Sequence, residues 1–193
     1  MNYLMKSGTL YLEPSNKLLA KVTKSFLGPE RTITLPGEGK LLETTILNQE
    51  TAADKKGDVR YRIYVLRDSH DEILMEAYPN YSPSEDPDQN GWPTYRVPKV
   101  NHARIHLKNH AIAWDPNKSE LQSQDEEAFR LRMLNSQYYR LEDVSGRSIF
   151  EMMHKGITGG WAISSEIAFP PEIICALFIF CRYIEQENEF PIV

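Results

Sequence analysis

The chain has 193 residues, with 22 lysines and arginines against 27 aspartates and glutamates, which gives a formal net charge of −5 at pH 7. This length favours a single domain over residues 1–193 with a sizeable core. The acidic balance argues against general nucleic-acid binding, although a local basic patch could survive it. Residues 1–13 hold no apolar stretch of the signal-peptide kind, so we expect a cytoplasmic protein.

Most of the chain is predicted to form short antiparallel strands. Its segments are rich in β-branched and aromatic residues, often alternate apolar with polar positions, and are separated by turn-forming stretches. The clearest strands are residues 61–66, 73–78, 103–114, 138–141, 148–154 and 161–167. Counting through the chain gives about 11 or 12 strands. Residues 125–134 fit either a helical turn or a strand, and we favour a strand.

Two segments share a plan. YRIYVLRDSHDEILMEAYPNY (residues 61–81) and YYRLEDVSGRSIFEMMHKG (residues 138–156) each contain an aromatic-rich strand, an acidic turn at Asp68 or Asp143, and a second strand with the pattern I-x-x-E or I-F-E. In the second segment, Gly146 can supply the positive φ that a hairpin turn needs. The similarity suggests a sheet built from repeated hairpins.

The strongest candidate for a ligand site is HARIHLKNHAIAW, residues 102–114, in which His102, His106 and His110 recur every four residues. On a helix these histidines could offer neighbouring metal ligands. On a strand they share one face, but consecutive ones lie about 13 Å apart and cannot chelate one ion. The alternation of apolar and polar residues favours the strand and argues against a metal site. The simplest interpretation of the polar residues is the solvent-exposed face of a strand. The functional interpretation is a basic patch for anionic headgroups, formed by Arg104, His106, Lys108 and His110.

Motifs for catalysis are scarce. HKGITGGW, residues 154–161, lacks the phosphate-cradling pattern of a P-loop and the strand-to-helix setting of a dinucleotide site. Asp143, Glu151 and Glu166 have no partner at a meaningful spacing for acid–base chemistry. We therefore expect no enzyme and no cofactor.

The segment PPEIICALFIFCRYIEQ, residues 170–186, is predicted to be a helix buried in the protein's own interior. Pro170 and Pro171 fit a helix entry. The apolar run from Ile173 to Phe180 faces every direction around the turn, as in a helix that is surrounded on all sides. It is too short to span a bilayer, which takes roughly 20 residues.

The cysteines of this helix, Cys175 and Cys181, are the two in the chain. They would lie about 9 Å apart along the helix axis and on different sides of it. They therefore cannot bridge each other. Two buried free thiols fit a reducing cytoplasm.

An antiparallel closed sheet threaded by one apolar C-terminal helix resembles the tubby C-terminal-like superfamily, which includes the tubby domain, phospholipid scramblases and LURP-one-related proteins. The resemblance rests on YYRLEDVSG (residues 138–146), RSIFEMMHK (147–155), GGWAI (159–163) and PEIICALFIFCRYIE (171–185). It implies a mainly β fold, a closed antiparallel barrel of about 12 strands around the buried helix. The nearest analogues are the bacterial-type members with a single domain.

The resemblance also implies a non-catalytic binding module, which recognises anionic phospholipid headgroups at a membrane surface or a protein partner. The alternative is a scaffold protein without a small-molecule ligand, using the acidic loops at residues 82–88 and 125–127; an enzyme without a recognisable motif ranks third. The chain lacks the lysine-x-arginine pair through which tubby domains bind phosphoinositides. The nearest matches are Arg60-Tyr61-Arg62 and Arg130-Leu131-Arg132.

Overall fold

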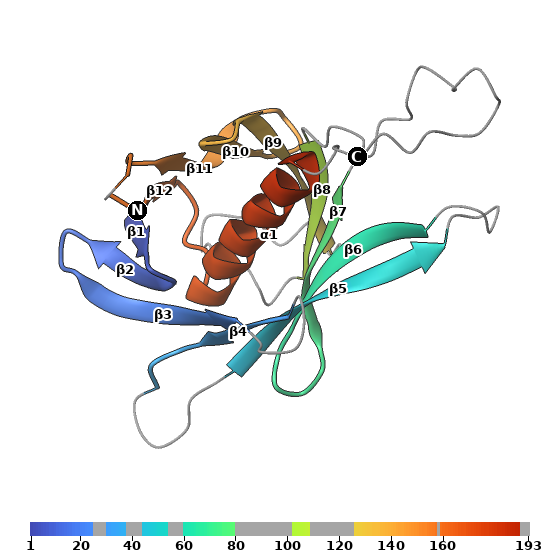
Figure 1. Ribbon diagram of the computed structural model, residues 1–193, viewed down its shortest axis with the longest axis horizontal. Helices are drawn as coiled ribbons and strands as arrows, with labels where there is room; N and C mark the ends of the chain where they lie inside the picture. Colours follow the sequence, from blue (N-terminus) through green and yellow to red (C-terminus); the bar gives the residue numbers. More distant parts are fainter. Residues whose placement is uncertain are drawn as a thin grey trace, which may run out of the picture.

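The computed structural model describes residues 1–24, 30–37, 44–53, 60–79, 102–108, 126–157 and 159–189. In this part of the chain a series of strands is followed by one C-terminal helix (Figure 1). The strands are β1 (Asn2–Lys6), β2 (Thr9–Glu13), β3 (Lys17–Lys24), β4 (Arg31–Thr34), β5 (Thr44–Ala53), β6 (Arg60–Arg67), β7 (Ile73–Pro79), β8 (His102–Lys108), β9 (Glu126–Asn135), β10 (Tyr138–Glu142), β11 (Ser148–His154) and β12 (Trp161–Ser165), and the helix is α1 (Pro171–Glu189). The prediction of a mainly β fold with a C-terminal helix is confirmed.

All the strand pairs are antiparallel. Each strand from β2 to β11 pairs with the next strand along the chain. The first strand, β1, pairs with both β2 and β12, so that Tyr3 lies opposite Leu12 on one side and Ile163 on the other. The segment that fitted either a helical turn or a strand is strand β9.

One predicted strand is shorter than the sequence suggested, and another can be checked only in part. The strand predicted at residues 161–167 ends at Ser165. There the Ser165 hydroxyl donates hydrogen bonds to the backbone oxygens of Ile149 (3.3 Å) and Ile167 (2.6 Å), and the chain turns away from the sheet. Of the strand predicted at residues 103–114, the part up to residue 108 is confirmed, and the remainder lies outside the described residues.

The helix lies inside the curved sheet, with β3 and β4 on one side of it in Figure 1 and β9 and β10 on the other. It begins at Pro171, and the first backbone bonds run from the amides of Ile173 and Ile174 to the Pro170 oxygen. From Ile173 to Phe180 every side chain is buried except Phe178, which is half-buried. The prediction that this segment is buried in the protein's own interior is confirmed. Within the described part of the chain, no helix combines the length and the apolar character needed to cross a bilayer.

Aromatic rings connect the helix to the sheet. Phe180 and Tyr183 of α1 pack against Tyr64 of β6, with ring centroids 5.0 and 5.1 Å apart. Phe178 packs edge-on against Trp161 of β12, at 6.1 Å. Since a buried aromatic or aliphatic side chain contributes roughly 1.5 to 3 kcal/mol through transfer alone, these contacts form a large part of the core.

The two cysteines are free and buried. Burial raises the pKa of both thiols, because the low-dielectric core disfavours the charged thiolate. Since the thiolate is the nucleophile and the metal ligand, Cys175 and Cys181 act as small apolar core residues.

Candidate functional site on the outer face of β8, β9 and β10

The predicted basic patch falls on β8, whose residues alternate between the core and the outer face. Ala103, Ile105 and Leu107 are buried. Arg104 is exposed on the outer face, and His106 and Lys108 lie there half-buried. The fourth predicted residue, His110, lies outside the described residues. Because residues 102–108 form a strand, the helical arrangement that would bring histidines together as metal ligands is wrong for His102 and His106. No group of metal-ligating side chains occurs in the residues that the structure describes.

The half-buried residues of the patch, His106 and Lys108, have neighbours on the adjacent strands. The His106 ring meets the Tyr78 ring of β7 edge-on, with centroids 5.3 Å apart. Glu76 lies directly opposite His106 on β7, and Glu126 lies opposite Lys108 on β9. Among the described patch residues, Arg104 therefore has the most accessible charge.

Strand β9 adds arginines that the sequence analysis did not assign to the site. Arg130 lies directly opposite Arg104, and Arg132 follows it on the same outer face. Both are exposed, while Phe129 and Leu131 between and beside them are buried. This alternation was visible in the sequence as EEAFRLRML, but only the strand register shows that Arg130 faces Arg104. From the sequence alone, Arg130-Leu131-Arg132 stands out only as a near match to the lysine-x-arginine pair of tubby domains.

The arginines of this face differ in whether they are paired. Arg132 Nη1 lies 3.5 Å from Glu142 Oε1, and Arg140 Nε lies 3.2 Å from Glu151 Oε1. Arg104 and Arg130 form no ion pair or hydrogen bond with any side chain in the described ranges. Two like charges directly opposite each other across a strand pair destabilise the sheet. Among the described residues, the charges of Arg104 and Arg130 have no ion-pair partner.

Arg104 and Arg130 line a hollow of about 440 Å³ on the outside of the sheet. Its other wall consists of Glu142 at the end of β10 and of Asp143 and Gly146 in the turn that follows. Val144 of this turn lies at the rim, 91% exposed. The hollow is thus bounded by basic side chains from β8 and β9 and by acidic ones from the turn.

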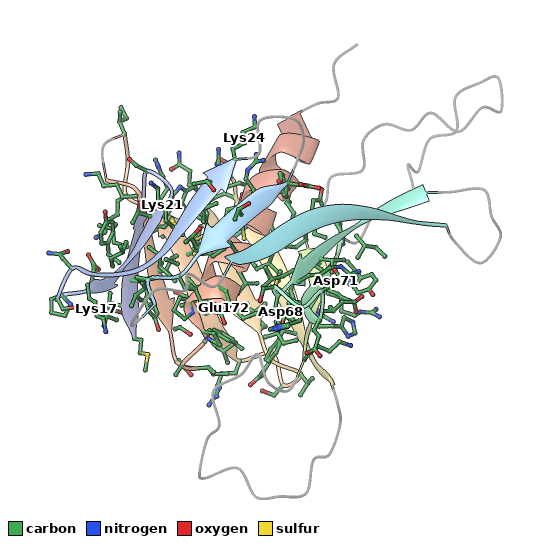
Figure 2. The ribbon with its side chains drawn as sticks, turned by 90° about the horizontal axis from the view of Figure 1, so that it is seen from below. Lys17, Lys21, Lys24, Asp68, Asp71 and Glu172 are labelled. Atoms are coloured by element: carbon green, nitrogen blue, oxygen red, sulfur yellow. The ribbon has the colours of Figure 1, made fainter. Side chains whose placement is uncertain are left out.

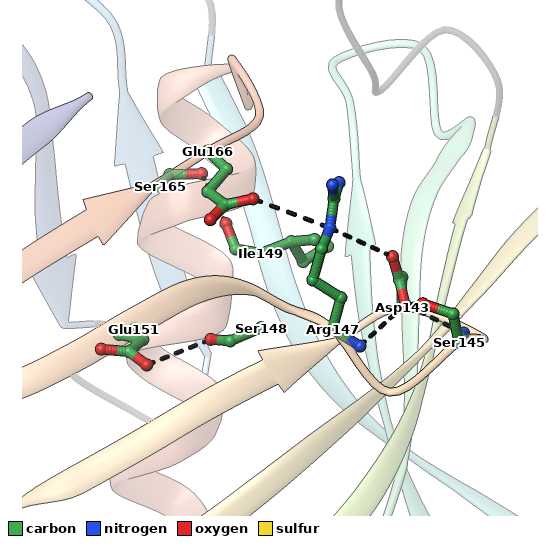
Figure 3. A network of polar contacts seen from close by, with 8 residues as sticks. All are labelled: Asp143, Ser145, Arg147, Ser148, Ile149, Glu151, Ser165 and Glu166. Carbon is green, nitrogen blue, oxygen red and sulfur yellow. Dashed lines mark hydrogen bonds and ion pairs between the residues drawn. The ribbon is translucent and has the colours of Figure 1, made fainter.

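In the acidic wall, the Asp143 carboxylate is bonded to neighbouring residues of its own turn, as Figure 3 shows. Asp143 Oδ1 accepts hydrogen bonds from the Ser145 hydroxyl (2.6 Å), the Ser145 amide (2.9 Å) and the Arg147 amide (3.0 Å). Arg147 Nε lies 3.6 Å from Asp143 Oδ2 and 3.7 Å from Glu166 Oε2. The Ser145 hydrogen bond is the main cause that lowers the pKa of Asp143, with the backbone amides and Arg147 adding to it. Asp143 is therefore ionised at neutral pH and its charge is largely compensated.

A second row of basic side chains lies on a different part of the surface. Lys17, Lys21 and Lys24 are exposed along β3, and Figure 2 shows them away from the acidic turn that contains Asp68 and Asp71. These lysines are not among the residues that line the hollow beside Arg104 and Arg130. They provide a matched control for any test of charge on β8 and β9.

The acidic loops suggested for a scaffold role are largely outside the described residues: residues 82–88 and Asp125 are not described, and Glu126 and Glu127 lie on β9.

Comparison of the chain with protein-family models, curated proteins and solved structures gave no match.

Proposed function

We propose that the chain is a non-catalytic binding module of the tubby-like type, which recognises anionic phospholipid headgroups through the outer face of β8 and β9. The observation that carries the proposal is the pair of exposed arginines, Arg104 and Arg130, which lie opposite each other and have no ion-pair partner among the described residues. In the proposed architecture the sheet is a closed barrel around α1. Its support is the pairing of β1 with both β2 and β12 and the burial of the helix.

Electrostatics favour a local and oriented interaction. The chain carries a net charge of −5, so an anionic membrane does not attract the molecule as a whole. A basic group close to an anionic surface contributes about 1 kcal/mol, and this attraction decays within a Debye length of about 8 to 10 Å. Binding must therefore depend on which face approaches the membrane and must weaken as salt increases.

Flotation with vesicles tests the proposal. The full chain should float with vesicles that contain an anionic phospholipid and stay behind with phosphatidylcholine alone. Replacing Arg104 and Arg130 together by Gln removes two charges and should weaken vesicle binding by on the order of 10-fold, more at low salt than at high salt. Lys108→Gln should have a smaller effect, because this half-buried side chain already has a partner.

The matched control replaces Lys21 and Lys24 together by Gln. It makes the same change in net charge on β3, and vesicle binding should be nearly unchanged. An equal loss in the two double variants would mean that net charge, and not this face, controls binding. No flotation with anionic vesicles would refute membrane recognition and leave a protein partner as the ligand to seek.

A further inference from the structure

We propose that the hollow between β8, β9 and the β10–β11 turn is a site for one phosphate monoester group, held between Arg104 and Arg130. This inference rests on the proposed function for its location and deepens it by naming the chemical group that is recognised.

The acids in the wall do not neutralise the two arginines. Glu142 is nearly buried and lies 3.5 Å from Arg132. Asp143 is held by three hydrogen bonds and by Arg147. Glu142 also lies opposite Arg130 on β10, but its ion pair is with Arg132. Among the described residues, two guanidinium charges therefore remain for a ligand. A phosphate monoester carries about −1.5 to −2 at pH 7 and matches them, whereas a phosphate diester carries a single charge.

The strand register brings the arginines within reach of one group. Directly opposite residues of an antiparallel pair have Cα atoms about 4.5 to 5.5 Å apart and side chains on the same face. Guanidinium groups bind phosphate through two parallel N–H donors each, so Arg104 and Arg130 can hold one tetrahedral group from two sides.

The hollow has room for more than the phosphate itself. Its volume of about 440 Å³ lies within the roughly 300 to 1,000 Å³ range of small-molecule pockets. Gly146 leaves its side-chain position open, with no atom within 4 Å of where a Cβ would be, and Val144 offers an apolar rim. The organic part of a phosphomonoester can lie against this rim.

The test measures binding to the full chain by calorimetry with four probes: glycerol phosphate as a soluble monoester, dimethyl phosphate as a diester, and vesicles of phosphatidylcholine with either phosphatidic acid or phosphatidylglycerol. Each monoester should bind at least about 10-fold more tightly than its diester counterpart. Arg130→Gln should lower the affinity for the monoester by about 10- to 100-fold. The affinity of Arg130→Lys should lie between those of Arg130→Gln and the wild type, because lysine keeps the charge but lacks the paired N–H donors of the guanidinium group.

Two controls separate lost contacts from lost folding. Lys21→Gln on β3 should leave binding unchanged. The melting temperature of Arg130→Gln should not fall, because the substitution relieves a like-charge contact. In the wild type, glycerol phosphate should raise the melting temperature, since a ligand that binds the folded state alone stabilises it.

The outcomes distinguish this inference from the function on which it rests. Soluble monoester binding that depends on Arg130, without vesicle binding, supports the site and overturns membrane recognition. Equal binding of both kinds of vesicle, unaffected by Arg130→Gln, overturns the site and keeps membrane recognition. Binding of no probe overturns both.

Discussion

The hairpins β6–β7 and β10–β11 are built alike and differ mainly in what they present to solvent. In the first, Leu66 lies opposite Met75, and the register then slips so that Arg67 lies opposite Ile73. In the second, Leu141 lies opposite Phe150, and the same slip places Glu142 opposite Ser148. The similarity that the sequence suggested for these segments thus extends to their strand registers.

The two turns also use the same hydrogen bonds. Asp68 Oδ1 accepts from the amides of His70 (2.8 Å) and Glu72 (2.9 Å). Asp143 Oδ1 accepts from the amides two and four residues later, as described above. In each turn the aspartate amide donates to the oxygen four residues on, and its own oxygen accepts from the amide three residues on. One aspartate therefore specifies the turn, whatever side chains follow it.

The difference lies on the outer face. The inward-facing tyrosines, Tyr64 and Tyr139, are both fully buried. The next residue in each strand is Val65 in the first hairpin, which is buried, and Arg140 in the second, which is half-buried and paired with Glu151. The inner residues and the turn therefore carry the fold, while the outer residues are free to differ in charge between the two hairpins.

The largest effect should come from the shared core. Tyr64→Ala and Tyr139→Ala should each lower the free energy of unfolding by about 3 to 5 kcal/mol, because each leaves a large cavity under the sheet. Urea unfolding measures both, and Val144→Ala in the exposed turn should stay within about 0.5 kcal/mol of the wild type. If one tyrosine cost less than about 1 kcal/mol, the two hairpins would not be equivalent in the core.

Removing the turn aspartates should have a smaller effect. Asp68→Ala loses two hydrogen bonds to backbone amides and should cost about 1 to 2 kcal/mol. Asp143→Ala should lower the melting temperature in the same direction, and Asp143→Asn should lower it less, since an amide oxygen can still accept these bonds.

The stabilising contribution of the Asp143 carboxylate should depend on pH in a defined direction. Its pKa is lowered in the folded protein, so its contribution is present above the unfolded-state value of about 4 and is lost as the pH falls through the folded-state pKa. The difference in melting temperature between wild type and Asp143→Ala should therefore shrink on going from about pH 7 to about pH 3. A difference that grows in acid would contradict the proposed role of the carboxylate.

Local sequence patterns could predict the helix, many of the strands and the acidic turns. The apolar run from Ile173 to Phe180 and the alternation in β8 depend on neighbouring residues alone, so they are legible in the sequence. The site was only partly predictable. Arg104 was identified from its own strand, but its partner Arg130 comes from a strand that follows residues 109–125, and no local pattern fixes the register between the two. For the same reason the sequence could not reveal that Tyr78 and Glu76 flank His106.

The smallest effect concerns the residue three positions after each aspartate. This position has a positive φ in both turns, 66° at Asp71 and 85° at Gly146. Gly146→Ala should cost about 1 kcal/mol, because an alanine disfavours the left-handed region even though no atom obstructs its Cβ. Gly146→Asp should cost less, since aspartate tolerates this conformation and already occupies it in the first hairpin. Thermal and urea unfolding of both variants test the prediction, with Asp71→Ala as the reciprocal change, which should also destabilise. Equal losses for Ala and Asp at position 146 would show that the two turns impose different backbone demands, despite their shared hydrogen bonds.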